Sequence, residues 1–261
     1  MTEPTVPTSR TDAEEQKLKL LNEEQRSVFE KISQEYADRY GRSDEEIQDW
    51  QLCLNVHCLL KFCTARNFVY EDVKSLIDDW SVQIQWRLSA KPHLITRSQV
   101  ENELDTTKAF WHGFDKEGRP IAVIRAHKHV VADRDYDECV LFALYTAEKG
   151  LNLMREKGVE RYNIVYDAGQ FGYKNFDLAL SKDMFKLMSY YAETLNNVYV
   201  LNANWVYRTI LKIVKPFMDP VTFSKIKLLE DPNNLFDYVS RDQILVEHGG
   251  NDTSDIQSSN L

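Results

Sequence analysis

Two short runs near the middle of the chain, Y-N-I-V-Y at Tyr162–Tyr166 and V-Y-V-L-N at Val198–Asn202, are rich in β-branched and aromatic residues. Short apolar runs of this kind are typical of buried strands. The residues between them follow a helical pattern over Leu178–Leu195. Strands joined by a helical crossover lie parallel in a sheet. This stretch therefore predicts an α/β fold with a largely parallel sheet.

The same alternation continues on both sides of this stretch. Further strands are predicted at Ile121–Arg125 and Ile226–Leu229, and further helices at Asp137–Glu156 and Trp205–Val214. Pro216 should end the last helix, because a proline ring blocks continuation of the helix.

The first half of the chain is predicted to be helical. Apolar residues recur there at helical spacing in two stripes, with another helix expected over residues 49–65. Lys91-Pro92 should end this region, which we expect to form a helical N-terminal unit over residues 14–92. The two stripes are Val28, Phe29, Ile32, Tyr36 and Tyr40, and Val73, Leu76, Ile77, Trp80, Ile84 and Leu88.

The composition of the chain limits its possible partners. The chain has 261 residues, 43% of them hydrophobic, and a formal net charge of -9. An acidic chain gains little from the counterion release that drives nucleic-acid binding, so nucleic acid is not expected as a partner. The chain has neither a signal-peptide segment nor an apolar run of about 18 residues, so any membrane contact should be peripheral. Residues 1–13 and 251–261 are polar and are predicted to be flexible tails.

The four cysteines are Cys53, Cys58, Cys63 and Cys139. They form no C-x-x-C motif, and the first three are spaced by five residues, which distributes them around a helix. We therefore expect reduced, buried thiols in a cytoplasmic protein.

Motifs of the common nucleotide and catalytic sites are missing. The chain contains no G-x-G-x-x-G, P-loop, G-x-S-x-G or H-E-x-x-H motif, and Gly169 with Gly172 is typical of a turn. No Ser-His-Asp or Cys-His arrangement can be argued from the sequence. We therefore expect a protein that is not an enzyme and that needs no cofactor.

Two polar clusters have part of the pattern of a metal site. His127 and His129 would share one face of a strand, but no third ligand follows, so we interpret them as surface residues. Asp133, Asp135 and Asp137 lack the glycine and the closing glutamate of a calcium loop and are interpreted as a solvated loop leading into a helix. No metal site is predicted.

Seven segments, in a shared order over roughly residues 50–250, resemble signatures of the CRAL-TRIO family, the fold of the yeast-type phosphatidylinositol transfer proteins. The segments cover most of the chain. They are Leu60–Phe68 (LKFCTARNF), Gln85–Arg87 (QWR), Gly113–Ile121 (GFDKEGRPI), Tyr190–Glu193 (YYAE), Asn202–Trp205 (NANW), Lys215–Ile226 (KPFMDPVTFSKI) and Glu247–Gly250 (EHGG).

This resemblance implies that a lipid-binding domain over residues 95–250 follows the helical unit. A twisted sheet would form the floor of a hydrophobic pocket, helices would form its walls, and the stretch around residues 205–226 would act as a gate. Such a pocket would hold phosphatidylinositol and exchange it with membranes. Gate and pocket residues are expected to be Phe217, Met218, Trp205, Phe185 and Met188, with Phe142, Tyr145 and Met184 as further wall candidates.

The resemblance also assigns a headgroup site. A phosphate accepts charge-assisted hydrogen bonds worth about 1.5–3 kcal/mol each. Thr222 and Lys225 match the family positions that hold the phosphate, and Arg66 matches the last arginine of the N-terminal signature. Glu193 and Asp115 match two further positions of that network. Without a lipid-binding role, Thr222 would be a helix N-cap.

Some departures from the family pattern leave alternatives open. After Asp167 the chain has Ala168–Lys174 in place of the hydroxyl-bearing segment that helps to hold phosphatidylcholine in some members. The second hydrophobic lipid is therefore open, and a sterol or a tocopherol-like ligand is an alternative. A protein-interaction domain with an unused cavity is another. The resemblance implies a cytoplasmic monomer that contacts membranes transiently.

Overall fold

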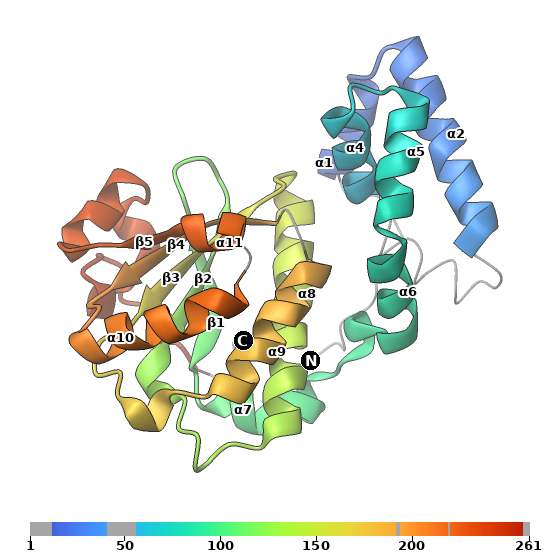
Figure 1. The fold of residues 1–261 in the computed structure, drawn as a ribbon. Helices are drawn as coiled ribbons and strands as arrows, with labels where there is room; N and C mark the ends of the chain where they lie inside the picture. Colours follow the sequence, from blue (N-terminus) through green and yellow to red (C-terminus); the bar gives the residue numbers. More distant parts are fainter. Residues whose placement is uncertain (1–11, 41–55, 192–193, 219, 258–261) are drawn as a thin grey trace. The chain divides into compact units, whose positions relative to one another are not determined.

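The computed structural model describes residues 12–40, 56–191, 194–218 and 220–257 (Figure 1). The chain divides into two compact units. The first comprises residues 1–95 with residues 155–158, and the second comprises residues 96–154 and 159–261.

The N-terminal unit is helical, as its apolar stripes predict. Phe29, Ile32 and Tyr36 are buried together with Val73 and Ile77 in one core. The hydroxyl of Tyr36 donates to Asp78 Oδ1 at 3.1 Å, which satisfies the polar end of a fully buried ring. Its helices are α1 (Asp12–Lys19), α2 (Glu23–Tyr40), α4 (Val56–Ala65), α5 (Tyr70–Asp79) and α6 (Ser81–Ala90).

Two details of this unit differ from the expectation. The stripe from Val73 to Leu88 belongs to two helices, because Trp80 between them takes φ −88° and ψ 3° and interrupts the helix. The Trp80 ring packs 5.4 Å from the ring of Phe62, which explains its place in the stripe. Asp12 already belongs to α1 rather than to a tail. Residues 49–55 of the expected second helix, and Cys53 with them, lie outside the described residues.

The second unit contains a five-stranded sheet in the order β1-β2-β3-β4-β5. β1 pairs antiparallel with β2, and the remaining neighbours are parallel, which confirms the predicted α/β class. The strands are β1 (Ala109–Phe114), β2 (Pro120–Arg125), β3 (Tyr162–Asp167), β4 (Leu195–Leu201) and β5 (Ile226–Leu228).

Helices connect these strands where the sequence predicts them, with one difference. The helix expected to reach Leu195 ends at Tyr190, because Tyr191 leaves the helical conformation (φ −112°, ψ 31°) and β4 begins at Leu195. β1 has no counterpart among the predicted strands. The helices of this unit are α7 (Glu101–Asp105), α8 (Tyr136–Lys157), α9 (Leu178–Tyr190), α10 (Trp205–Val214) and α11 (Pro220–Ser224).

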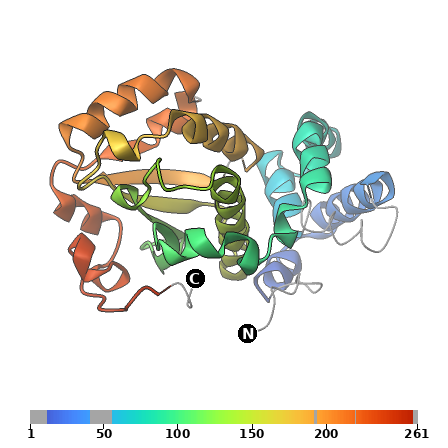
Figure 2. The same cartoon turned by 90° about the horizontal axis from the view of Figure 1, so that it is seen from below.

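The two faces of the sheet are covered by different parts of the chain. Phe110, Val165 and Tyr199 point to one face, where they form a dry core with Leu235 and Ile244 of the C-terminal turns. Helices α8, α9 and α10 lie over the other face (Figure 1). Seen from below, α9 and α10 lie above the strands and the red C-terminal segment lies at the lower left (Figure 2).

The C-terminal segment is ordered beyond the point where a flexible tail is expected. The backbone N–H of Asp252 donates to Ile244 O at 3.0 Å, and Val246 N–H donates to Asp252 O at 2.9 Å. Ile256 packs against the core under the sheet. These contacts tie residues 252–256 to the fold.

Candidate functional site

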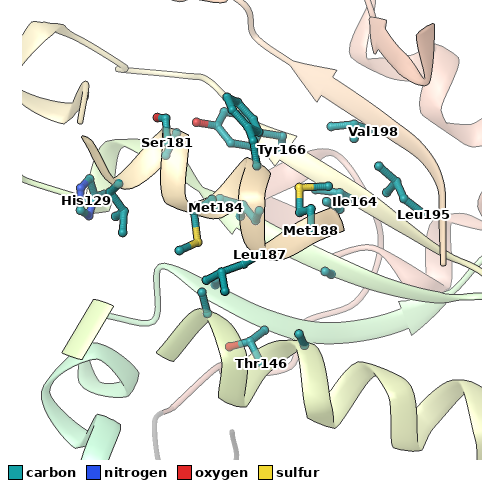
Figure 3. Close-up of a pocket in the computed structure, with 18 of the residues that line it drawn as sticks. His129, Thr146, Ile164, Tyr166, Ser181, Met184, Leu187, Met188, Leu195 and Val198 are labelled. Carbon is teal, nitrogen blue, oxygen red and sulfur yellow. The ribbon is translucent and has the colours of Figure 1, made fainter. Parts of the chain in front are cut away.

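A cavity of about 440 Å³ lies within the second unit, between the helix-covered face of the sheet and α8, α9 and α10 (Figure 3). Its size falls in the range of about 300–1,000 Å³ that is common for small-molecule sites. The sheet forms its floor, because alternate strand residues that point away from the dry core point into it. These floor residues are Trp111, Ala122, Ile124, Ile164, Tyr166 and Val198.

The walls are apolar side chains of α8 and α9. Phe142 on α8 and Met184, Phe185 and Met188 on α9 line the cavity. Tyr145, which was expected beside them, is buried outside the lining. Methionine side chains are flexible and polarizable, so this wall can adapt its shape to what fills the cavity.

The indole of Trp111 depends on a glycine in α8. Its Nε1–H donates to Thr146 O at 2.8 Å, and its ring packs edge-on against Tyr162 at 5.3 Å. A Cβ atom at Gly150 would lie 2.1 Å from Trp111 Cζ2. Gly150 therefore gives the indole the space that it fills at the cavity wall.

The stretch predicted to act as a gate, residues 205–226, contains α10, a 3₁₀ turn at Lys215–Phe217 and α11. Val206, Tyr207, Ile210 and Val214 form the buried side of α10, which makes this helix amphipathic. Helix α10 ends at Val214 before Pro216, as predicted. The gate residues that contribute to the cavity lining are Tyr207, Ile210, Leu211, Val214, Met218, Thr222 and Ile226.

Two of the predicted gate and pocket residues lie outside the cavity. Trp205 is 68% exposed and Phe217 is 46% exposed, and neither is part of the lining. Trp205 is the first residue of α10, and its ring packs at 6.3 Å against the exposed ring of Tyr173. These side chains form the outer surface of the gate.

Thr222 and Lys225 lie at the C-terminal end of the gate. Thr222 lines the cavity and belongs to α11, so it is not the N-cap of that helix. Lys225 N–H donates to Thr222 O at 3.2 Å, and Lys225 O accepts from Val198 N–H at 2.9 Å, which joins this turn to β4. Lys225 is half-buried and is not itself part of the lining.

The other predicted headgroup residues are not brought together with these two. Asp115 Oδ1 accepts from the N–H groups of Glu117 and Arg119, and its Oδ2 accepts from Asn163 at 2.7 Å. Asp115 therefore holds the β1–β2 turn and does not line the cavity. Glu193 lies outside the described residues, and Arg66 is an exposed residue of the N-terminal unit.

One end of the cavity is polar, a feature that sequence reasoning missed. Lys108 Nζ lies 3.2 Å from His129 Nδ1 and forms an ion pair with Glu103 Oε2. Cys139 Sγ donates to Glu103 Oε1 at 3.2 Å, and His129 Nε2 lies 3.7 Å from Asp177 Oδ2. Figure 3 places His129 and Ser181 at the opposite end of the lining from Leu195.

The prediction that His129 is a surface residue is therefore wrong. A 3₁₀ turn at Ala126–Lys128 carries it to the end of the cavity, where its backbone carbonyl accepts from Asn175 Nδ2 at 2.7 Å. Asp133, Asp135 and Asp137 are exposed at the start of α8, as predicted. Of the cysteines in the described parts of the chain, Cys63 and Cys139 are buried and Cys58 is half-buried, and none of the three forms a disulfide.

Burial sets the protonation of the groups around the cavity. It lowers the pKa of His129, and the positive charge of Lys108 lowers it further, so this imidazole is neutral at pH 7. Burial raises the pKa of the Cys139 thiol to about 11 and that of the Tyr162 hydroxyl to about 12. Both therefore stay protonated and uncharged at neutral pH.

Within the parts of the chain that the structure describes, no helix is long and apolar enough to cross a bilayer. The chain is similar to a CRAL-TRIO domain-containing protein of Schizosaccharomyces pombe, with 28% identity over 202 residues that cover 74% of this chain and 45% of that protein. It is also similar to the phosphatidylinositol transfer protein CSR1 of Eremothecium gossypii, with 28% identity over 207 residues that cover 74% of this chain and 47% of that protein. The chain thus spans less than half the length of these two curated relatives.

A solved structure shares the fold. The crystal structure of Sfh5 superposes with a TM-score of 0.62 and 21% sequence identity, covering 91% of each chain. The family model described as the CRAL/TRIO domain matches residues 104–250, more than half of the chain. This range contains the whole sheet and every residue that lines the cavity. The resemblance seen in the sequence is confirmed: the chain belongs to the CRAL/TRIO domain family.

Proposed function

We propose that this chain binds phosphatidylinositol and exchanges it with membranes. The observation that carries the proposal is the apolar cavity, closed on one side by a gate that ends in Thr222 and Lys225. The similarity to a protein named phosphatidylinositol transfer protein supports it. The chain would act in the cytoplasm, without catalysis.

An apolar cavity removes the main free-energy cost of moving a phospholipid through water, which is the exposure of its acyl chains. Each methylene exposed to water costs about 0.8 kcal/mol, and a two-chain phospholipid has about 30 of them. The floor and walls of the cavity replace this water with tyrosine, phenylalanine and methionine side chains. Exchange between bilayer and cavity then requires no nucleotide, because apolar groups surround the acyl chains in both places.

Thr222 and Lys225 are proposed to bind the headgroup phosphate. Thr222 contributes a hydroxyl at the lining, and Lys225 follows it by three residues, a spacing that keeps two side chains on neighbouring positions of a helical turn. Among the described residues, the ammonium group of Lys225 has neither a hydrogen bond nor an ion pair. It can therefore offer its three donors to a phosphate.

The outer surface of the gate is proposed to contact the membrane. Trp205, Ile213, Phe217 and Val221 are exposed there, although large apolar side chains are costly in water. The Lys182 ammonium lies 4.4 Å from the centre of the Phe217 ring. Aromatic rings combined with lysines are favourable at the surface of a bilayer that contains anionic lipids.

The test is transfer of labelled phosphatidylinositol between donor and acceptor vesicles. The variant is Lys225→Ala, and the matched control is Lys227→Ala. Lys227 lies two residues further on but packs over the rings of Tyr199 and Tyr238, away from the cavity. We expect transfer by the wild type and by the control, with most of the transfer lost in Lys225→Ala at unchanged melting temperature.

Other outcomes would contradict the proposal. Equal transfer by Lys225→Ala and the wild type would remove the headgroup assignment. Absence of transfer by the folded wild type would remove phosphatidylinositol as the ligand and favour the alternatives, a different hydrophobic ligand or a protein-interaction domain.

A further inference from the structure

The charged side chains at the polar end of the cavity are paired with counter-charges inside the protein. Lys108 pairs with Glu103, Arg134 pairs with Asp177, and Arg125 pairs with Glu247. Burial of an additional charge without a counter-charge costs several kcal/mol, whereas a neutral hydrogen-bonding group costs much less. This end of the cavity is therefore suited to a neutral polar group.

His129 presents a donor to this space. Lys108 Nζ lies 3.2 Å from His129 Nδ1, and an ammonium group can only donate, so Nδ1 accepts and the ring proton is on Nε2. Nε2 is buried and has no hydrogen-bond partner among the described residues. A buried donor without a partner loses about 1–3 kcal/mol, which a ligand oxygen would recover.

An acceptor lies beside this donor. Asp177 Oδ2 is 3.7 Å from His129 Nε2, too far for a hydrogen bond, yet a single oxygen atom can lie within about 3 Å of both. Asp177 is buried at the N-terminus of α9, where Oδ1 accepts from Leu180 N–H at 3.0 Å. Its Oδ2 accepts from Arg134 Nε, and a carboxylate oxygen has a second lone pair for a ligand hydroxyl. Asn175 fixes the backbone of His129. The donor and the acceptor are therefore held in place before a ligand arrives.

We propose that the end of the cavity at His129 binds the hydroxyl group of a neutral lipid alcohol, with its hydrocarbon part along the α9 wall. The hydroxyl accepts from His129 Nε2–H and donates to Asp177 Oδ2. This inference rests on the proposed function, because it requires that the cavity take up lipid, and it names the class of the second ligand.

Other headgroups fit this pair less well. A carboxylate or a phosphate would accept from His129, but the carboxylate of Asp177 would repel it. An ether oxygen or a ketone can accept but has no proton for Asp177. A hydrocarbon would leave the His129 donor without a partner. Only a group that both accepts and donates satisfies both atoms.

The first experiment uses the wild-type protein and four probes of equal chain length: 1-dodecanol, dodecyl methyl ether, dodecane and dodecanoate. Binding is measured by equilibrium dialysis with radiolabelled probes at pH 8. We expect dodecanol to bind about tenfold more tightly than dodecane, with the ether between them and dodecanoate weaker than the alcohol. Dodecanoate binding as tightly as the alcohol, or the ether binding as tightly as the alcohol, would overturn the proposal.

The second experiment uses two variants at the same position. His129→Phe keeps a ring but removes the donor, so it should abolish the difference between dodecanol and dodecane. His129→Gln keeps an N–H donor and should restore part of it. If His129→Phe is unfolded, the four probes with the wild type and the binding of dodecanol and dodecane by His129→Gln still test the proposal. An unchanged preference for the alcohol in folded His129→Phe would contradict the assignment.

Failure of this proposal can be distinguished from failure of the proposed function. Lys225→Ala should bind dodecanol like the wild type, and folded His129→Phe should still transfer phosphatidylinositol between vesicles. Loss of phosphatidylinositol transfer with an intact alcohol preference would refute only the transfer function. Intact transfer with no alcohol preference would refute only the hydroxyl site.

Discussion

The substitution Gly150→Ala tests how tightly the cavity wall is packed. The added Cβ would lie 2.1 Å from Trp111 Cζ2 and 2.6 Å from Cη2, well inside van der Waals contact. The indole must therefore move, and its hydrogen bond to Thr146 O is lost or strained. Overpacking costs about 1–3 kcal/mol, and the hydrogen bond is worth about 1 kcal/mol.

Helix propensity works in the opposite direction. Alanine is more favourable than glycine inside a helix by about 1 kcal/mol, and Gly150 lies inside α8. The expected net effect is a loss of about 1–3 kcal/mol in the free energy of unfolding. Trp111 lines the cavity and packs against Tyr162, so a displaced indole would change the cavity wall, and lipid uptake should fall as well.

Urea unfolding followed by circular dichroism measures this effect. The control is the same substitution in a Trp111→Phe background, where the atoms that clash are absent and Gly150→Ala should be neutral or stabilising. A double-mutant cycle then isolates the steric coupling between the two positions. A stabilising effect of Gly150→Ala in the wild-type background would refute the reasoning.

Three further perturbations have expected outcomes. Asn175→Ala removes donors to the carbonyls of His127 and His129, at 2.9 and 2.7 Å, and should lower the free energy of unfolding by about 2–4 kcal/mol in urea titrations. A change below about 0.5 kcal/mol, the usual scatter of surface substitutions, would contradict this expectation. Phe217→Ser, on the exposed side of the gate, should weaken sedimentation with anionic vesicles about fivefold or more at unchanged stability, and unchanged sedimentation would argue against this surface as the membrane contact. Burial lowers the pKa of His129 and His248 from the ordinary value of 6.5, so the unfolded chain binds protons that the folded chain does not. The melting temperature should therefore be highest above about pH 7 and should decrease as the pH falls through 6.5, less steeply in His129→Phe than in the wild type. An equal dependence of the melting temperature on pH in both proteins would exclude His129 as a cause of this decrease.

The regular elements were predictable where one periodicity dominates the sequence. β2, β3, β4 and α10 appear within a few residues of their predicted bounds. Each strand contains a short run rich in β-branched and aromatic residues, and α10 has apolar residues at helical spacing. β1 was missed because A-F-W-H-G-F mixes polar residues and a glycine, and only Phe110 of this strand is fully buried. Trp205 and Phe217 show a related limit, since Trp205 is the first residue of α10 and Phe217 lies in the turn after it, where the helical period does not fix which way a side chain points.

The polar end of the cavity could not be predicted from local sequence. Lys108 and His129 are 21 residues apart, and Cys139 meets Glu103 across 36 residues. No spacing within one helix or strand connects such pairs, so their meeting depends on the strand order and on the turn at Ala126–Lys128. The cavity-lining residues Met184 and Met188 could be predicted from the sequence because they follow the period of a single helix.

The place of β5 at the edge of the sheet has a consequence for how the fold opens. This strand has three residues, and its first residue, Ile226, is the last of the predicted gate. In the described part of the chain it pairs with β4 alone. Its ladder can fray without disturbing the pairing of β2 with β3, and low-stability segments of this kind open well below the free energy of global unfolding. The backbone amide of Leu229, which donates to Val200 O at 3.0 Å, should then exchange with deuterium far earlier than that of Val165. Opening at this edge of the sheet would break only the few hydrogen bonds between β4 and β5. The apolar core on the other face would keep the remaining strands together.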